Sequence, residues 1–402
     1  MRVWVLALAL LLAGPAAAVD TDYVTVQRGR SLTDAGDCMP CHTIPGGTPF
    51  AGGRAIQTPF GTMLSPNLTP DNETGIGAWS DDQFVRAVTK GLGPGGEHLY
   101  PAMPYTYYTR VTEGDLLAIR AYLKTLDPVH NRVQTDQLPF PFSIRQSLYA
   151  WNALFYRGGA FRPDPQQSPE WNRGAYLVQG LGHCAACHTA KDWLGGDETS
   201  RALQGGVIQG WFAPNLTGDA RAGLGGWSID DVAEYLATGH NRFAAASGPM
   251  AEVVAYSTSK LTDADRRAIA LYLKGLPGNP QNPAPVADLP AGSDLYVDNC
   301  SACHNRDGSG MPKMFPALAH GPFVQSADPT SLIRVVLLGQ RSVATAGAPT
   351  APAMPAFGWK FNDSEVAAVL TYIRNTWGNA AAPVSASDVR SERAKLEDDP
   401  AQ

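Results

Sequence analysis

One short motif occurs three times in the chain and accounts for every cysteine in it. The copies are Cys38-Met-Pro-Cys41-His42, Cys184-Ala-Ala-Cys187-His188 and Cys300-Ser-Ala-Cys303-His304. Cys-x-x-Cys-His is the attachment signature of c-type haem. On a helical turn, residues three apart share a face, so both thiols of a copy can form thioethers with one porphyrin while the histidine binds the iron. The sequence therefore predicts three covalently bound c-type haems.

Other uses of paired cysteines fit the chain less well. A thiol redox site of the thioredoxin type needs a βαβ context, and a zinc ribbon needs its cysteine pairs closer together in sequence. A disulfide framework is the usual expectation for an even number of cysteines in an exported protein, but the spacing of these cysteines argues against it. Haem attachment remains the favoured interpretation.

The start of the chain has the pattern of a secretory signal peptide over residues 1–18. Arg2 supplies the positive end, an apolar run follows, and Ala16-Ala-Ala18 forms a small-residue cleavage site. The run is shorter than the roughly 20 residues that span a bilayer, which disfavours an uncleaved anchor. We expect cleavage after Ala18, export from the cytoplasm and no later spanning helix. The net charge of -6 gives no basic surface for a phosphate backbone, so no nucleic-acid partner is expected.

Self-similarity around the three motifs predicts the domain plan. A Gly-x-x-Leu element precedes each motif, at Gly29, Gly174 and Gly292, and we expect each to begin a short helix that ends at the motif. Asn-Leu-Thr and Trp-Ser elements follow the first two motifs at matching positions, which indicates an internal duplication. Each copy closes with an amphipathic helix, capped by Thr112, Thr262 or Asn362.

These repeats predict a mainly α chain of three tandem helical domains with long loops. The expected boundaries are a signal peptide at 1–18, domains at 20–130, 166–280 and 285–378, an aromatic-rich linker at 131–165 and a polar tail at 379–402.

A methionine before each closing helix is the candidate for the sixth iron ligand. Met103 and Met354 have proline on both near sides, and the stiffened loop lowers the entropy lost in holding a weak thioether against iron. Met250 lies in Gly248-Pro-Met, and His240 is its rival as ligand of the second haem. If every iron carries His and Met, none keeps an open position, and the chain is expected to pass electrons rather than bind a substrate.

Five further motifs give the chain a family resemblance. They are Asn67-Leu-Thr-Pro-Asp71, Gly75-Ile-Gly-Ala-Trp-Ser80, His98-Leu-Tyr-Pro-Ala-Met-Pro-Tyr105, Glu170-Trp-Asn-Arg-Gly-Ala-Tyr176 and Pro349-Thr-Ala-Pro-Ala-Met354. With the haem motifs, they resemble the three-haem cytochrome c subunit of bacterial membrane-bound dehydrogenases, which oxidise alcohols, gluconate or sorbitol. The resemblance covers nearly the whole mature chain and implies that each helical domain is cytochrome c-like.

The resemblance also implies a function. In that family a separate periplasmic subunit with pyrroloquinoline quinone or flavin oxidises the substrate, and the cytochrome relays electrons to ubiquinone in the cytoplasmic membrane. The chain is then a subunit without a catalytic residue of its own, on the periplasmic side of the membrane. Some relatives end in a hydrophobic anchor, whereas 385–402 here is polar. The alternatives are a self-standing multihaem oxidoreductase, either a peroxidase or a sulfur-compound dehydrogenase, and a soluble shuttle to an oxidase.

Peripheral attachment to the membrane is one interpretation of the linker. Residues 138–161 are rich in aromatic side chains, which suits the bilayer interface or a partner subunit. Burial between the first two haem domains is the alternative.

Overall fold

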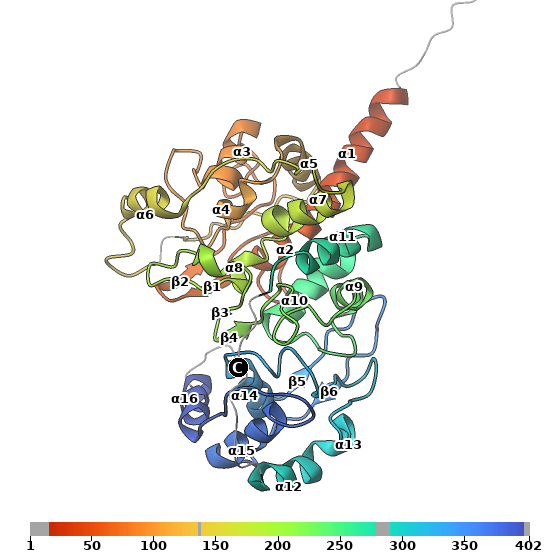
Figure 1. Cartoon of the computed structure of the whole chain (residues 1–402). Helices are drawn as coiled ribbons and strands as arrows, with labels where there is room; N and C mark the ends of the chain where they lie inside the picture. The colour runs from red at the N-terminus through yellow and green to blue at the C-terminus, as the bar shows by residue number, and fades with distance from the viewer. Residues whose placement is uncertain (1–15, 136–137, 279–289, 398–402) are drawn as a thin grey trace, which may run out of the picture.

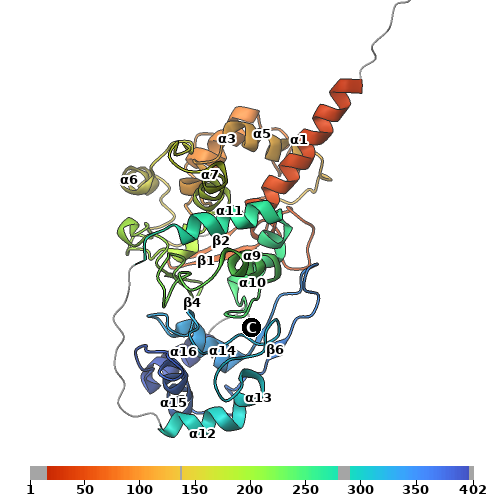
Figure 2. The same ribbon diagram turned by 45° about the vertical axis from the view of Figure 1, so that its right-hand side comes forward.

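The computed structural model describes residues 16–135, 138–278 and 290–397. This part of the chain is mainly helical, and its strands form short antiparallel pairs. The three helical modules follow one another in chain order, with the second between the first and the third (Figures 1 and 2). The predicted mainly α fold with long loops is therefore confirmed.

The first module contains two long helices that bracket a hairpin and shorter helices. Ser80 begins α3 with a full capping box, as its Ser-x-x-Gln pattern indicates, and Thr112 caps α5 by accepting the Asp115 backbone N–H. The elements are α1 (Ala16–Ala35), α2 (Cys38–Cys41), β1 (Ala55–Thr58), β2 (Gly61–Leu64), α3 (Asp81–Lys90), α4 (Tyr105–Tyr108) and α5 (Glu113–Leu123).

The second module repeats this plan. Ser228 forms a capping box with Asp231, and Thr262 caps the closing helix. The elements are α7 (Pro169–Tyr176), the π-helix η1 (Leu177–Leu181), α8 (Ala185–His188), η2 (Thr199–Arg201), β3 (Gly206–Ile208), β4 (Trp211–Ala213), α9 (Ile229–Thr238), α10 (Pro249–Tyr256), η3 (Thr258–Lys260) and α11 (Asp263–Lys274).

The third module is shorter, and an additional helix follows it. The segment expected only as a polar tail contains α16 (Ala386–Glu397). This helix packs on α14 (Thr330–Leu338) and α15 (Asp363–Arg374) and buries Val389 and Leu396. The elements are α12 (Pro290–Asn299), α13 (Ser301–His304), α14 (Thr330–Leu338), β5 (Gln340–Arg341), β6 (Ala353–Met354), α15 (Asp363–Arg374) and α16 (Ala386–Glu397).

Glycine lets the first and last helices of each module cross at close range. A Cβ on Gly29, Gly174 or Gly292 would lie 1.8, 1.9 or 2.3 Å from a backbone oxygen of the closing helix, far inside van der Waals contact. The expectation that these glycines begin their helices is wrong, because the described helices already include Ala16, Pro169 and Pro290. The Gly-x-x-Leu repeat marks a crossing point instead.

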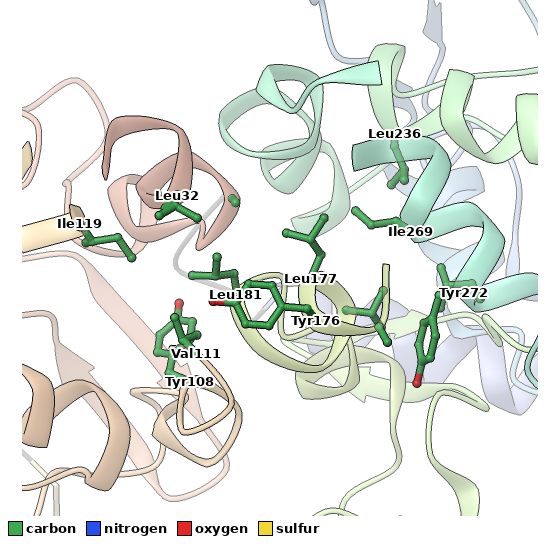
Figure 3. Close-up of a cluster of buried hydrophobic side chains, with 14 of the residues drawn as sticks. Leu32, Tyr108, Val111, Ile119, Tyr176, Leu177, Leu181, Leu236, Ile269 and Tyr272 are labelled. Carbon is green, nitrogen blue, oxygen red and sulfur yellow. The ribbon is translucent and has the colours of Figure 1, made fainter. Parts of the chain in front are cut away.

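The first two modules share one hydrophobic core, whereas the third has its own. Figure 3 shows Leu177 and Leu181 of η1 between the side chains of the first module, among them Leu32 and Val111, and Ile269 of α11. All five side chains are at least nine-tenths buried. The first two haem domains are therefore a single packed body.

The linker holds this body together from one side. Its helix α6 (Ser147–Phe155) lies at the edge of the molecule (Figure 1), with Leu148 buried. Trp151 Nε1 donates to the Leu194 carbonyl of the second module at 2.9 Å, and the Tyr156 hydroxyl donates to the Thr89 carbonyl of the first. The linker is thus partly buried against both modules, and its other side chains remain exposed.

The predicted leader lies almost entirely outside the described residues, which begin at Ala16. None of the helices that the structure describes is long and apolar enough to cross a membrane.

Candidate haem sites

Each Cys-x-x-Cys-His motif folds into one helical turn at the end of the first long helix of its module. These turns are α2, α8 and α13. All six thiols are free of disulfide bonds. Cysteines three apart on such a turn face the same side, which is the geometry that two thioethers to one porphyrin require.

The histidine of each motif is oriented by a backbone carbonyl. His42 Nδ1 lies 2.8 Å from the Pro66 oxygen, His188 Nδ1 lies 2.6 Å from the Pro214 oxygen, and His304 Nδ1 lies 3.0 Å from the Pro316 oxygen. A carbonyl can only accept, so Nδ1 carries the proton and Nε2 keeps its lone pair. This is how a metal-binding imidazole is usually held by the groups around it.

Burial keeps these rings neutral. It lowers the pKa of His42, His188 and His304 below the ordinary value, although the hydrogen bond to each proline carbonyl opposes this. A neutral imidazole with a free Nε2 is the form that binds iron. The residues present therefore fit a c-type haem in all three modules.

The first motif has an unusual electrostatic environment. Burial raises the pKa of the Cys38 thiol, and the charge of Asp37 adds to the rise. Burial also raises the pKa of Asp37, reinforced by the charge of Glu252. Asp37 has a left-handed backbone at φ 50° and immediately precedes Cys38. Within the described chain its Oδ1 has no hydrogen-bond partner.

The candidate methionines lie in different kinds of element. Met103 lies in the turn before α4, Met250 lies in the first turn of α10, and Met354 lies in β6, where it pairs with Gln340 of β5. All three are partly buried and pack against a hydrophobic core. Their role as sixth ligands stays a prediction.

His240 is the rival of Met250, and its environment is incomplete. Its side chain is buried, and neither ring nitrogen has a hydrogen-bond partner among the residues that the structure describes. A buried polar group without a partner is costly, so such a group often contacts something other than the polypeptide. His240 therefore remains a candidate for the sixth ligand of the second haem.

The first two attachment motifs lie close together across the shared core. The Tyr108 ring packs edge-on against His183, at 5.5 Å between ring centroids, and its hydroxyl donates to the Gly36 carbonyl. Gly36 precedes the first motif by two residues, and His183 directly precedes Cys184. The packing brings the two haem-binding turns to one interface.

The three proline carbonyls are functional groups that the sequence reasoning missed. Pro66 and Pro214 stand directly before the duplicated Asn-Leu-Thr elements, so the repeat itself marked them. Pro316 belongs to no such element. No sequence signal identifies its carbonyl as the acceptor for His304.

Three helical modules, each with a thiol pair and an imidazole oriented by a backbone carbonyl on one helical turn, define a multihaem c-type cytochrome. A sequence profile of the family described as cytochrome c matches residues 26–127, 172–277 and 290–377. The chain belongs to the cytochrome c family and carries three covalently bound c-type haems, and electron transfer is its function.

Characterised relatives cover most of the chain. It is 44% identical over 393 residues to the gluconate 2-dehydrogenase cytochrome c subunit of Pantoea cypripedii, covering 92% of this chain and 89% of that relative. It is 39% identical to the quinone-type alcohol dehydrogenase cytochrome c subunit of Gluconobacter oxydans, over 94% of this chain and 84% of the relative. For the fructose dehydrogenase cytochrome subunit of Gluconobacter japonicus, the identity is 36%, over 92% and 83%. These findings confirm the family resemblance and the three haems.

Proposed function

We propose that the chain is the cytochrome subunit of a quinone-linked dehydrogenase complex on the periplasmic side of the bacterial cytoplasmic membrane. It accepts single electrons from a catalytic subunit that carries pyrroloquinoline quinone or flavin, and it delivers them to ubiquinone. The relatives are named for different substrates, gluconate, alcohol and fructose, but all are cytochrome subunits. What these relatives have in common is electron transfer, and this supports a relay role whatever the substrate of the complex.

The observation that carries this proposal is the packing of the haem-binding turns. A relay needs its redox centres held at fixed, short separations, and the shared core of the first two modules provides a rigid frame for two of them. Met103, Met250 and Met354 are the proposed sixth ligands. Iron with ligands on both faces favours electron transfer over substrate binding.

Purification in mild detergent from the native membrane tests the proposal. We expect a larger dehydrogenase subunit to copurify, an alcohol, sugar or sugar acid to reduce the haems, and a ubiquinone analogue to reoxidise them. A chain that is recovered alone, with no substrate that reduces its haems and with peroxide turnover of its own, would contradict the proposal and favour the self-standing enzyme.

The exposed side of the linker is the proposed contact with the membrane. Phe140 and Tyr149 are 81% and 63% exposed, and Ile144 and Leu154 are also exposed. Residues 138–161 include two arginines and no acidic residue. Aromatic side chains with nearby positive charge suit the interface of a bilayer with anionic headgroups. This charge pattern favours a lipid surface over a partner protein as the occupant.

The double substitution Tyr149→Ser and Leu154→Ser tests this contact. We expect it to move the protein from the membrane fraction to the soluble fraction and to weaken binding to vesicles containing anionic lipid, because it removes exposed apolar area. The matched control is Trp359→Ser in the third module, where the side chain is 84% exposed, and this variant should bind vesicles normally. If both variants bind the vesicles equally well, the linker is not the part of the protein that binds the membrane.

A further inference from the structure

A charged side chain of the second module is linked through Arg54 to the haem-binding turn of the first. Glu252 lies on α10 and forms a two-pronged ion pair with Arg54, in which Arg54 Nη2 donates to Glu252 Oε2 at 2.9 Å and Nη1 donates to Oε1. Arg54 Nη1 also donates to the Pro40 carbonyl at 3.0 Å. Pro40 lies between Cys38 and Cys41, inside the attachment motif itself.

This geometry holds a guanidinium group against the first haem motif. Arg54 alone has a long, flexible side chain with costly rotamer entropy. Two hydrogen bonds to one carboxylate fix the plane of the guanidinium group, and the Pro40 carbonyl fixes its position. Glu252 therefore determines where the Arg54 charge lies relative to the motif, although it belongs to another module.

The ion pair lies in a partly screened environment. The Arg54 and Glu252 side chains are 26% and 35% exposed. Next to them, Lys260 and Asp34 form a second pair at 3.4 Å across the same module boundary, and Asp37 is buried beside Cys38. Charges in such a position are screened less by solvent and salt than charges in bulk water, so they can act on a nearby haem.

Charges near a haem shift its reduction potential in a known direction. Oxidised haem carries one more positive charge than reduced haem, so a nearby anion favours the oxidised form and a nearby cation favours the reduced form. Neutralising Glu252 should raise the potential, and neutralising Arg54 should lower it. Because the two charges lie side by side, removing both should leave the reduction potential of the first haem nearly unchanged.

We propose that Glu252 is a positioning residue for the first haem, through which docking of the second module sets the reduction potential of the first. It holds Arg54 against the attachment turn, and its own charge offsets the charge of Arg54. The inference rests on the attached haems and not on the identity of a dehydrogenase or quinone partner. Met250 lies two residues before Glu252, so one helix carries both a candidate ligand of the second haem and the charge that acts on the first.

Redox titration of the full chain with its three haems, followed by visible spectroscopy, tests the proposal. The substitution Glu252→Gln keeps the shape of the side chain and should raise the potential of the first haem, leaving the third unchanged. The substitution Arg54→Gln should lower it, and the double variant should return close to the unsubstituted protein. The exposed Glu170→Gln on α7 is the matched control and should change none of the potentials.

The shifted haem must be identified as the first one. A Cys38→Ala background leaves that haem with a single thioether link, which changes its absorption band and marks it among the three. A shift in the marked haem would support the proposal. An unchanged potential of that haem in Glu252→Gln at full haem content would overturn it. So would an equal shift of all three haems, because that result indicates a general change in the protein. If Glu252→Gln does not fold, Arg54→Gln alone still reports the sign, and a potential of the first haem that does not fall in that variant would overturn the proposal.

Discussion

Replacing Gly174 with alanine is expected to destabilise the body formed by the first two modules by about 1–3 kcal/mol, the usual cost of an overpacked core. The added Cβ would lie 1.9 Å from the Ala268 backbone oxygen and 2.9 Å from Tyr272 Cβ. Backbone of a buried helix cannot move aside as a flexible side chain can, so α7 and α11 must separate. Urea unfolding followed by circular dichroism measures the change, and a lowered midpoint is the expected result.

Gly114→Ala is the matched control for this prediction. Gly114 is an exposed residue in the first turn of α5, and an added Cβ would meet nothing within 4 Å. Alanine should be neutral or should stabilise the protein by up to about 1 kcal/mol, because it lowers the backbone entropy of the unfolded chain. If Gly174→Ala is as harmless as Gly114→Ala, the helices do not cross at the distance that the structure gives.

This crossing also shows what the sequence could and could not predict. The Gly-x-x-Leu repeat is recognisable because three copies share it, but the prediction that it begins a helix is wrong. Glycine is a poor helix former, and local propensity therefore favours placing it at a boundary. The reason for Gly29, Gly174 and Gly292 lies in the closing helix, whose backbone approaches from far along the sequence. Only the tertiary structure supplies that contact.

Helix boundaries with local signals were predicted well. Thr112 and Thr262 cap their helices as their sequence patterns indicate, because a side-chain oxygen accepts a backbone N–H only a few residues away. The joining of the first two modules was not predicted. Leu177 and Leu181 bury between elements of both modules, and no periodicity within one helix tells which distant surface will cover it.

The residues of the haem sites also fall into two groups, those that local sequence predicts and those that it does not. The cysteines and histidines of the motifs were predictable because covalent attachment requires them within five consecutive residues. The carbonyl of Pro316, which orients His304, comes from a loop after the motif that carries no sequence signal. The Arg54–Glu252 pair joins residues from two modules. Which residues contact a site residue from another part of the fold depends on the tertiary structure. A single sequence does not show it.

Replacing Met250 with leucine is expected to remove the Met-to-iron absorption of one haem. Leucine keeps the size of the side chain but offers no lone pair, so the second haem should become high-spin. Met250→His should keep the haem low-spin and lower its potential, since histidine in place of methionine moves the couple by a sizeable part of the roughly 0.8 V that axial ligands span. Absorption, electron paramagnetic resonance and redox titration measure these changes.

Two further variants complete this experiment: one is a control, and the other distinguishes Met250 from His240 as the ligand of the second iron. Met63→Leu removes a buried methionine from the β1–β2 hairpin and should leave all three haems unchanged. His240→Asn should also leave the axial spectra unchanged if Met250 is the ligand. A spectrum that changes in His240→Asn and not in Met250→Leu would assign the second iron to His240, whose two ring nitrogens otherwise find no partner in the described chain. The second haem would then have two histidine ligands and a lower potential than a haem with His and Met, because methionine ligation raises the potential.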